Sequence, residues 1–163
     1  MSDSDLKQLN FPQTISDSSI KGIILVEICD KVVCDALSQF NLPIVSVDMP
    51  NVPFEELNGI DVVTMESKKN LKKIINQLIE KGAESFGFVG DLYSPNVSRG
   101  FQERYNALSE CLAEHQLPLN QKNCLLHQTP EDFRNFQTTV NNLQAMISLP
   151  DVFICGNDWT AIQ

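Results

Sequence analysis

Acidic side chains follow several apolar segments of this 163-residue sequence. Each segment has the length and composition of a β-strand, and the acid stands at its carboxyl end. In open parallel sheets, ligands bind in the crevice beyond the carboxyl ends of the strands. Carboxylates gathered there can accept hydrogen bonds from hydroxyl groups or bind a cation. Alternatively, these acids only begin the following loops and helices, because the helix dipole favours acidic side chains at helix N-termini. The acids concerned are Glu27, Asp48, Glu66, Asp91 and Asp158.

A basic residue, Arg104, stands at a position where a helix disfavours a cation. A helix is predicted from about Ser98, and Arg104 lies near its N-terminal end, where the helix dipole repels positive charge. Arg104 also lies beside the apolar stripe of this helix, so it requires partners such as the oxygens of a ligand or a neighbouring carboxylate. Alternatively, its aliphatic stem passes the core and the guanidinium reaches solvent. The stripe consists of Phe101, Tyr105, Leu108 and Leu112.

Other residue patterns give less support to chemistry. The single tryptophan, Trp159, directly follows Asp158, where it either stacks on a sugar ring or packs in a core. Gly87 and Gly90 form neither a dinucleotide-binding nor a P-loop motif. No Ser-His-Asp or Cys-His group has a suggestive spacing. Both histidines, His115 and His127, lie outside any ligand-like spacing, so we expect no metal site. Because nucleotide-binding and catalytic motifs are also missing from the sequence, we expect no cofactor and no enzymatic activity.

Charge and cysteine usage restrict the class of protein. The net charge is −9, and the lysine group at 68–73 is expected to be the solvated face of a helix, so this segment is not expected to bind nucleic acid itself. No apolar run approaches the roughly 20 residues of a membrane span, and the polar start does not resemble a secretory signal. The five cysteines are odd in number and form no C-x-x-C, which favours free thiols in the cytoplasm.

Segments of strand and helix character alternate along the chain, which predicts an α/β fold with parallel sheets. Most strand candidates are continuous apolar runs, as expected for strands covered on both faces. A boundary between two lobes is predicted near Lys81–Ser85, which divides the chain into 1–82 and 83–163. The predicted strands are 22–28, 44–48, 60–65, 86–90 and 151–156, with 124–126 as a weaker sixth. The predicted helices cover about 30–40, 67–82, 98–112 and 129–147.

Several motifs resemble those of the LacI/GalR family of transcriptional regulators. Residues 20–25 (IKGIIL) are similar to the family's first effector-domain strand motif, and 43–48 (PIVSVD) to "P-V-V-x-x-D". The segment 78–90 (LIEKGAESFGFVG) resembles "L-I-x-x-G-H-x-x-I-x-x-I-x-G". Residues 94–108 resemble "S-x-S-x-x-x-R-x-x-G-F", and 152–161 (VFICGNDWTA) resemble "A-I-x-x-x-N-D-x-x-A". The order and spacing of these motifs extend over residues 20–163.

The resemblance implies a type I periplasmic-binding-protein-like fold, with two Rossmann-like lobes and a sugar or sugar-derivative effector between them. It implies effector contacts from Asp48, Arg104 and Asp158, with Asn157 supporting the turn. Trp159, Glu66 and Asp91 complete the predicted ligand-binding set. A homodimer is implied, and DNA is contacted only through a headpiece that this sequence lacks. Relative to the family pattern, we expect the domain to be incomplete at both ends.

Two other classes of protein remain open at this point. One is a secreted or periplasmic solute-binding protein of the same fold, which the cysteine usage and the start of the sequence disfavour. The other is a Mg²⁺-dependent phosphotransfer module of flavodoxin-like type, in which the strand-end acids are metal ligands. That module requires a paired acidic cluster, a phosphoacceptor Asp and a Lys on one short sheet, and the long two-lobe order of this sequence argues against it.

Overall fold

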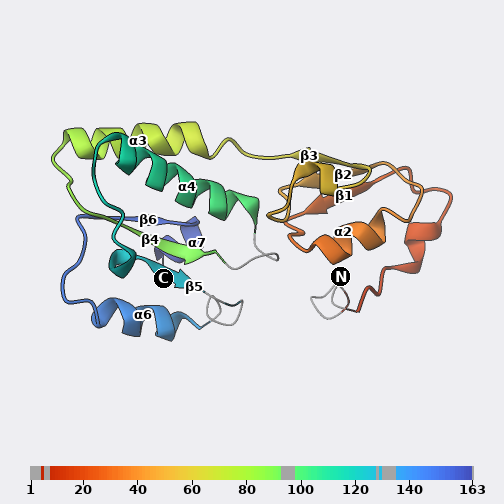
Figure 1. Ribbon diagram of the computed structural model, residues 1–163. Helices are drawn as coiled ribbons and strands as arrows, with labels where there is room; N and C mark the ends of the chain where they lie inside the picture. Colours follow the sequence, from red (N-terminus) through yellow and green to blue (C-terminus); the bar gives the residue numbers. More distant parts are fainter. Residues whose placement is uncertain (1–4, 6–7, 93–97, 128, 130–134, 163) are drawn as a thin grey trace. The chain divides into compact units, whose positions relative to one another are not determined.

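Six strands form two three-stranded parallel sheets in the part of the chain that the computed structural model describes, namely residues 5, 8–92, 98–127, 129 and 135–162. The chain divides into two units, each with one sheet (Figure 1). Unit 1 comprises residues 1–65 and 94–99, and unit 2 comprises 66–93 and 100–163. The predicted α/β class with parallel sheets is therefore confirmed. The units divide after Met65, whereas the sequence places a lobe boundary after Gly82, and the assignment of lobes stays a prediction.

Unit 1 has the sheet order β1-β2-β3, with all strands parallel. Ile23 pairs with Ile44, which in turn pairs with Ile60, so the three strands start level with one another. The helix α2 connects β1 to β2, and Asp30 caps its N-terminus by accepting a hydrogen bond from the Val32 amide at 2.8 Å. The elements are η1 (Gln13–Ser16), β1 (Ile23–Val26), α2 (Lys31–Leu37), β2 (Ile44–Val47), η2 (Phe54–Glu56) and β3 (Ile60–Val63).

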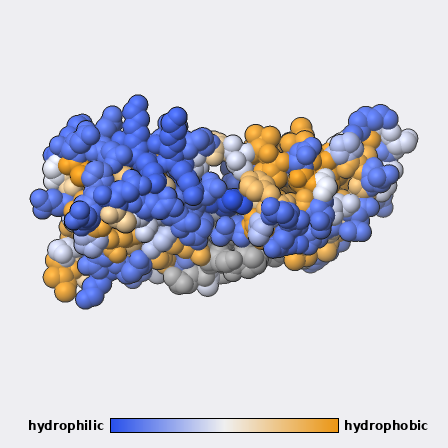
Figure 2. Space-filling view, turned by 45° about the horizontal axis from the view of Figure 1, so that its top comes forward, coloured by the Kyte–Doolittle hydropathy of each residue, from blue (hydrophilic) through white to orange (hydrophobic). Residues whose placement is uncertain are grey.

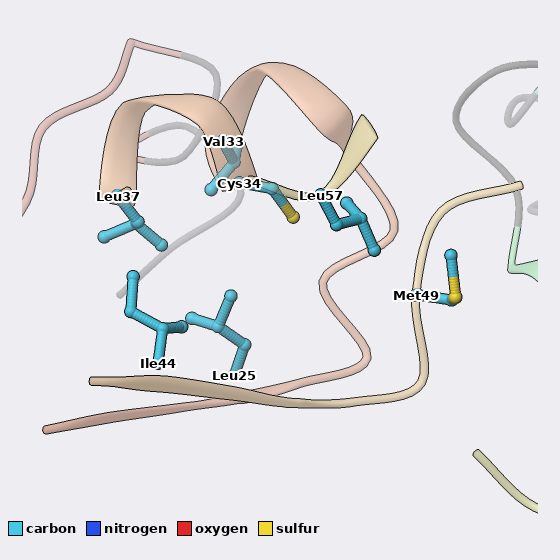
Figure 3. Close-up of a cluster of buried hydrophobic side chains, with 7 residues drawn as sticks. All are labelled: Leu25, Val33, Cys34, Leu37, Ile44, Met49 and Leu57. Carbon is cyan, nitrogen blue, oxygen red and sulfur yellow. The ribbon is translucent and has the colours of Figure 1, made fainter. Parts of the chain in front are cut away.

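The core of unit 1 lies between α2 and one face of this sheet. Figure 3 shows Leu25 and Ile44 directed from the strands toward the apolar side of α2. Because side chains alternate along a strand, every second residue of β1 and β2 belongs to this face. The buried members of the cluster are Leu25, Val33, Cys34, Leu37, Ile44, Met49 and Leu57.

The opposite face of this sheet corrects one expectation from the sequence. The apolar runs predict strands covered on both faces, but on this face the side chains of β1 and β3 are exposed, as is Val47 of β2, and Val45 is of intermediate burial. Among the described residues, α2 is the helix that packs on this sheet, and it covers a single face. The apolar residues of the second face therefore form a surface that no other described residue covers. Figure 2 shows a hydrophobic area over the part of the molecule that contains β1, β2 and β3.

Unit 2 has the sheet order β5-β4-β6, again parallel, with β4 in the centre and buried throughout. Helices α3 and α4 pack against this sheet through Ile75, Leu108 and Leu112, which meet Phe86 and Phe88 from β4. The elements are α3 (Lys68–Glu80), β4 (Phe86–Asp91), α4 (Arg99–Glu114), η3 (Gln121–Asn123), β5 (Leu125–His127), α6 (Phe136–Gln144), β6 (Val152–Cys155) and α7 (Asp158–Ile162).

All six predicted strands are present, displaced by at most a few residues at their ends. The predicted helix start at Thr129-Pro130 falls largely outside the described residues, and α6 is described from Phe136. Ser67 stands at the N-cap position of α3, but its side chain makes no capping hydrogen bond. Glu66 caps this helix instead, because its carboxylate accepts from the amides of Lys69 and Asn70 at 2.5 and 3.2 Å.

Candidate functional site at the carboxyl edge of the second sheet

Polar side chains gather at the carboxyl ends of the strands in unit 2. Asp91 ends β4, His127 ends β5, and Asn157 and Asp158 follow β6. Because β5, β4 and β6 are parallel neighbours in that order, these ends meet at one edge of the sheet. Three of the seven predicted ligand-binding residues therefore share this edge, and His127 joins them although the sequence analysis set it aside.

Asp91 and His127 form a buried pair in which both side chains are more than 90% buried. His127 Nδ1 lies 2.5 Å from Asp91 Oδ1, and His127 Nε2 lies 2.9 Å from Thr139 Oγ1 on α6. The order carboxylate–imidazole–hydroxyl is that of a catalytic triad. Here it joins three elements within the protein interior. The Asp91 carboxylate, which the sequence predicts to contact an effector, is therefore hydrogen-bonded to the His127 imidazole.

Arg104 reaches the same edge through Phe101. Its guanidinium carbon lies 5.7 Å from the centroid of the Phe101 ring. That ring packs over Gly90 and Gly156, where a Cβ on Gly90 would stand 3.3 Å from the ring and a Cβ on Gly156 would overlap it. Gly90 and Gly156 lie at the carboxyl ends of β4 and β6. Because neither has a side chain, the Phe101 ring can pack directly on their backbone. The Arg104 guanidinium in turn packs on the Phe101 ring.

The guanidinium of Arg104 has an unsatisfied donor. Its Nη1 atom is buried and has no hydrogen-bond partner in the part of the chain that the structure describes. Leaving a buried donor without a partner costs about 1–3 kcal/mol, and more when the group is charged. Such a group is stabilised when an acceptor reaches it. Arg104 can therefore donate to an oxygen of a bound molecule.

The start of α7 holds Asn157 and Asp158 together with one more predicted residue, Trp159. Asn157 Oδ1 accepts hydrogen bonds from the amide and the hydroxyl of Thr160, at 2.8 and 2.7 Å, and so caps the helix. Asp158 Oδ1 accepts from the Trp159 amide at 2.9 Å. Asp158 is exposed, and Trp159 is 55% exposed. The geometry thus gives Asn157 a supporting role in the turn and presents Asp158 and Trp159 to solvent.

Asp48 lies in unit 1, and its carboxylate forms hydrogen bonds with residues of the same unit. Asp48 directly follows β2 and has a φ of 68°, a left-handed conformation that is uncommon for residues other than glycine. Its Oδ1 accepts from the Met49 amide at 2.8 Å, and its Oδ2 accepts from the hydroxyl of Ser98. Burial raises the pKa of the nearby Cys29 thiol to about 12, and the negative charge of Asp48 adds to this shift. Asp48 therefore anchors the segment that contains Ser98.

Arg99 belongs to the same anchoring segment. Its amide donates to the Met49 carbonyl at 3.0 Å, and its Nη1 donates to the Val52 carbonyl at 3.2 Å. Its guanidinium also stacks 4.5 Å from the centroid of the Phe54 ring. The spacing of residues in the sequence does not reveal this cation–π contact, because it joins two residues that lie far apart in the chain.

Solved structures and curated proteins are similar to this chain over much of its length. A LacI transcriptional regulator from Bacillus cereus subsp. cytotoxis NVH 391-98 is 19% identical with a TM-score of 0.66, covering 86% of this chain and 48% of its own. A LacI regulator from Lactobacillus casei with bound Tris is 20% identical with a TM-score of 0.64, covering 96% and 53%. This chain has the fold of LacI-family regulators. Catabolite control protein A of Staphylococcus xylosus is 32% identical over 108 residues.

These similarities confirm the resemblance to LacI-family regulators and the periplasmic-binding-protein-like fold that it implies. The chain spans about half the length of the two LacI-family structures, and the match covers 30% of the Staphylococcus xylosus protein. No protein-family model matches the chain. At 19 and 20% identity, the structures show the fold alone, so the effector contacts implied for Asp48, Arg104 and Asp158 stay predictions.

Two further observations concern the described residues as a whole. None of their helices combines the length and apolar composition that a membrane span requires. Nor do three or more His, Cys, Asp or Glu side chains come together among them in an arrangement that would hold a metal ion.

Proposed function

We propose that this chain is the effector-sensing region of a LacI/GalR-like transcriptional regulator and that its effector is a small polyhydroxyl molecule, a sugar or sugar derivative. The observation that carries the proposal is the buried Nη1 of Arg104, which has no hydrogen-bond partner among the described residues. It lies on Phe101 at the carboxyl edge of the second sheet, where ligands bind in open α/β folds. An effector hydroxyl is an acceptor that would satisfy this donor.

Two exposed side chains at the start of α7 support the same class of ligand. The Asp158 carboxylate accepts hydrogen bonds from hydroxyl groups, and Trp159 offers an aromatic face on which a sugar ring stacks. Asp48 and Glu66 are weaker candidates, because hydrogen bonds within the protein engage both of their carboxylates. We assign Asp91 to the support of the site, since its carboxylate bonds to His127.

In this proposal the protein senses rather than catalyses. Effector binding favours the conformation that it binds more tightly and so shifts the population of the regulator. DNA is contacted by a headpiece outside these residues, because the net charge of −9 does not suit phosphate binding. The five thiols, all free, fit the reducing cytoplasm, where we place this regulator. As in the sequence analysis, a homodimer is the assembly that we expect of the intact regulator.

Trp159 allows a direct binding test, because it is the single tryptophan of the sequence and lies at the proposed site. The chain is titrated with monosaccharides, disaccharides and sugar phosphates in a Tris-free buffer while tryptophan emission is recorded. We expect at least one of these probes to change the emission saturably. Arg104→Gln then weakens that binding at least tenfold, which corresponds to a loss of about 1.4 kcal/mol.

Lys81→Gln is the matched control, since it removes the same charge from an exposed site at the end of α3. We expect it to change the affinity less than twofold. The proposal fails if no probe in the panel binds the wild-type chain, or if Arg104→Gln and Lys81→Gln bind the probe equally well.

A further inference from the structure

The turn between η2 and β3 contains the dipeptide Asn58–Gly59, and Asn58 is the single asparagine of the sequence that a glycine follows. The Ile60 amide donates to the Leu57 carbonyl at 3.2 Å and closes this turn. Gly59 has a φ of 72°, close to the value that a type II turn requires at its third position. Because a residue with a Cβ is strained at such a φ, the turn itself favours glycine after Asn58.

Both residues of the dipeptide are exposed to solvent. Among the described residues, no hydrogen bond engages the Asn58 side chain or the Gly59 amide. A Cβ built on Gly59 would meet no atom within 4 Å, so no other segment covers this position. The backbone nitrogen of Gly59 is therefore free to approach the side-chain carbonyl carbon of Asn58, Cγ.

We propose that Asn58–Gly59 is a spontaneous modification site, at which the asparagine converts to isoaspartate without an enzyme. The Gly59 nitrogen attacks Asn58 Cγ and forms a new C–N bond. The bond from Cγ to the side-chain nitrogen breaks, and this nitrogen takes up the proton of the Gly59 amide and leaves as ammonia. Water then opens the resulting succinimide at either of its carbonyl groups, which leaves isoaspartate or aspartate. The reaction consumes water and requires no oxidant, reductant or cofactor.

Isoaspartate at position 58 would lengthen the turn from which β3 begins. Its main chain runs through the side-chain carbons, so the backbone between Leu57 and Gly59 gains one methylene group. Leu57 is 4% exposed in the core of unit 1, and Ile60 pairs with Ile44 of β2. The added length therefore falls between two residues that packing and strand pairing hold in place. The new carboxylate also adds one negative charge to a net charge of −9.

Asn41 provides a comparison within the same molecule. It is also exposed and belongs to unit 1, but Leu42 follows it, and the Leu42 amide donates to the Phe40 carbonyl at 2.5 Å. The folded full chain is incubated in mildly alkaline buffer, and peptide mass spectrometry follows the loss of each side-chain amide. Methylation by an isoaspartate-specific methyltransferase identifies the isomer. We expect Asn58 to convert at least tenfold faster than Asn41, because glycine has no side chain to shield its nitrogen.

Two glycines offer a matched pair of variants. Gly59 and Gly82 are both exposed, have φ values of 72° and 98°, and would each place a Cβ in open space. Gly59→Ala should slow the conversion of Asn58 at least tenfold by shielding the nitrogen. Gly82→Ala introduces the same kind of backbone strain in unit 2 and should change the rate less than twofold. Circular dichroism checks that each variant is folded. If Gly59→Ala unfolds, Asn58→Gln replaces it, because the longer side chain requires a larger ring and should abolish the reaction.

Hydrogen exchange tests the expected effect on the turn. After incubation, the amides of β3 should exchange at least tenfold faster in the modified chain than in the fresh chain, because the start of the strand is displaced. The amides of β6, which lie in unit 2, should exchange at the same rate in both. The proposal is overturned if Asn58 converts no faster than Asn41, or if Gly59→Ala and Gly82→Ala convert at the same rate. Unchanged exchange in β3 after complete conversion would overturn the effect on the turn.

Discussion

Gly156→Ala is expected to disturb the site that we assign to the effector without touching any predicted ligand. A Cβ on Gly156 would come well within the 3.0 Å that real Cβ contacts keep from the Phe101 ring. The φ of Gly156 lies outside the left-handed region, so the backbone conformation at this position is compatible with alanine. The obstacle to alanine is the steric overlap with the Phe101 ring. To restore an ordinary carbon–carbon contact, the ring must move by about 1 Å. We expect this overpacking to lower the free energy of unfolding by about 1–3 kcal/mol.

The cause can be isolated in a double-mutant cycle with Phe101→Ala. Without the ring, the new methyl group meets no obstacle, and alanine reduces the entropy of the unfolded chain relative to glycine. In the Phe101→Ala background, Gly156→Ala should therefore be neutral or stabilise the protein by about 0.4–1 kcal/mol. The destabilisation by Gly156→Ala should thus disappear or reverse in the Phe101→Ala background, which requires a coupling energy of at least about 1 kcal/mol.

The measurement is urea unfolding followed by the fluorescence of Trp159, which stands three positions after Gly156 and reports on unit 2. An equal destabilisation by Gly156→Ala in both backgrounds would refute the packing of Phe101 on this glycine. It would also remove the support that we assign to Arg104. A second readout is the affinity for the probe identified with the wild-type chain, which should fall in Gly156→Ala because Arg104 rests on the displaced ring.

Three further predictions concern groups outside that contact. His127→Ala should cost about 3–5 kcal/mol in urea unfolding, because the Asp91 carboxylate stays buried without its imidazole, and adding Asp91→Ala should recover part of that loss. Hydrogen bonds from Ser85 and Glu84 hold the pKa of Asp151 below 3.8, so its contribution to stability is present above about pH 4 and is lost as the pH falls through the folded pKa. Asp151→Asn should therefore destabilise the protein at pH 7, and its difference from the wild type in urea unfolding should shrink as the pH falls below 4. The pKa of the Cys29 thiol is about 12, so very little thiolate is present at pH 8. The rate of its alkylation by iodoacetamide at pH 8, measured by peptide mass spectrometry, should be about three orders of magnitude lower than that of a free thiol.

The strands and most helices were predictable because they depend on local sequence. Apolar runs such as those of β4 and β6 and the stripe of α3 identify their elements without knowledge of the rest of the chain. Asn157 was likewise predictable as a supporting residue, since its partner Thr160 is only three positions away. Local capping was less certain. Glu66 and Ser67 are adjacent, and the sequence does not say which of the two turns toward the amides of α3.

The contacts that shape the site could not be predicted from spacing. His127 meets Asp91 across 36 positions because β5 pairs with β4 in a particular register, Asp91 with His127. Thr139 joins them only because α6 packs on β5. A single sequence contains neither the strand order nor the register, so a histidine without nearby ligands gives no sign of this pair. The seat of Phe101 on two glycines has the same origin, since Gly90 and Gly156 become neighbours when β4 pairs with β6.

The strand-end acids divide into two groups once their hydrogen bonds are known. Asp48, Glu66 and Asp91 are engaged within the protein by a hydroxyl, by helix amides and by an imidazole. Asp158 is exposed at an edge where the buried Nη1 of Arg104 has no hydrogen-bond partner among the described residues, and its Oδ1 accepts from the Trp159 amide. Where a ligand displaces one of these partners, the free energy of binding is reduced by about the value of a charge-assisted hydrogen bond, roughly 1.5–3 kcal/mol. Effector recognition in this unit should therefore depend on Arg104 and Asp158 more than on the other acids, because Arg104 Nη1 has no partner among the described residues and the Asp158 side chain is exposed to solvent.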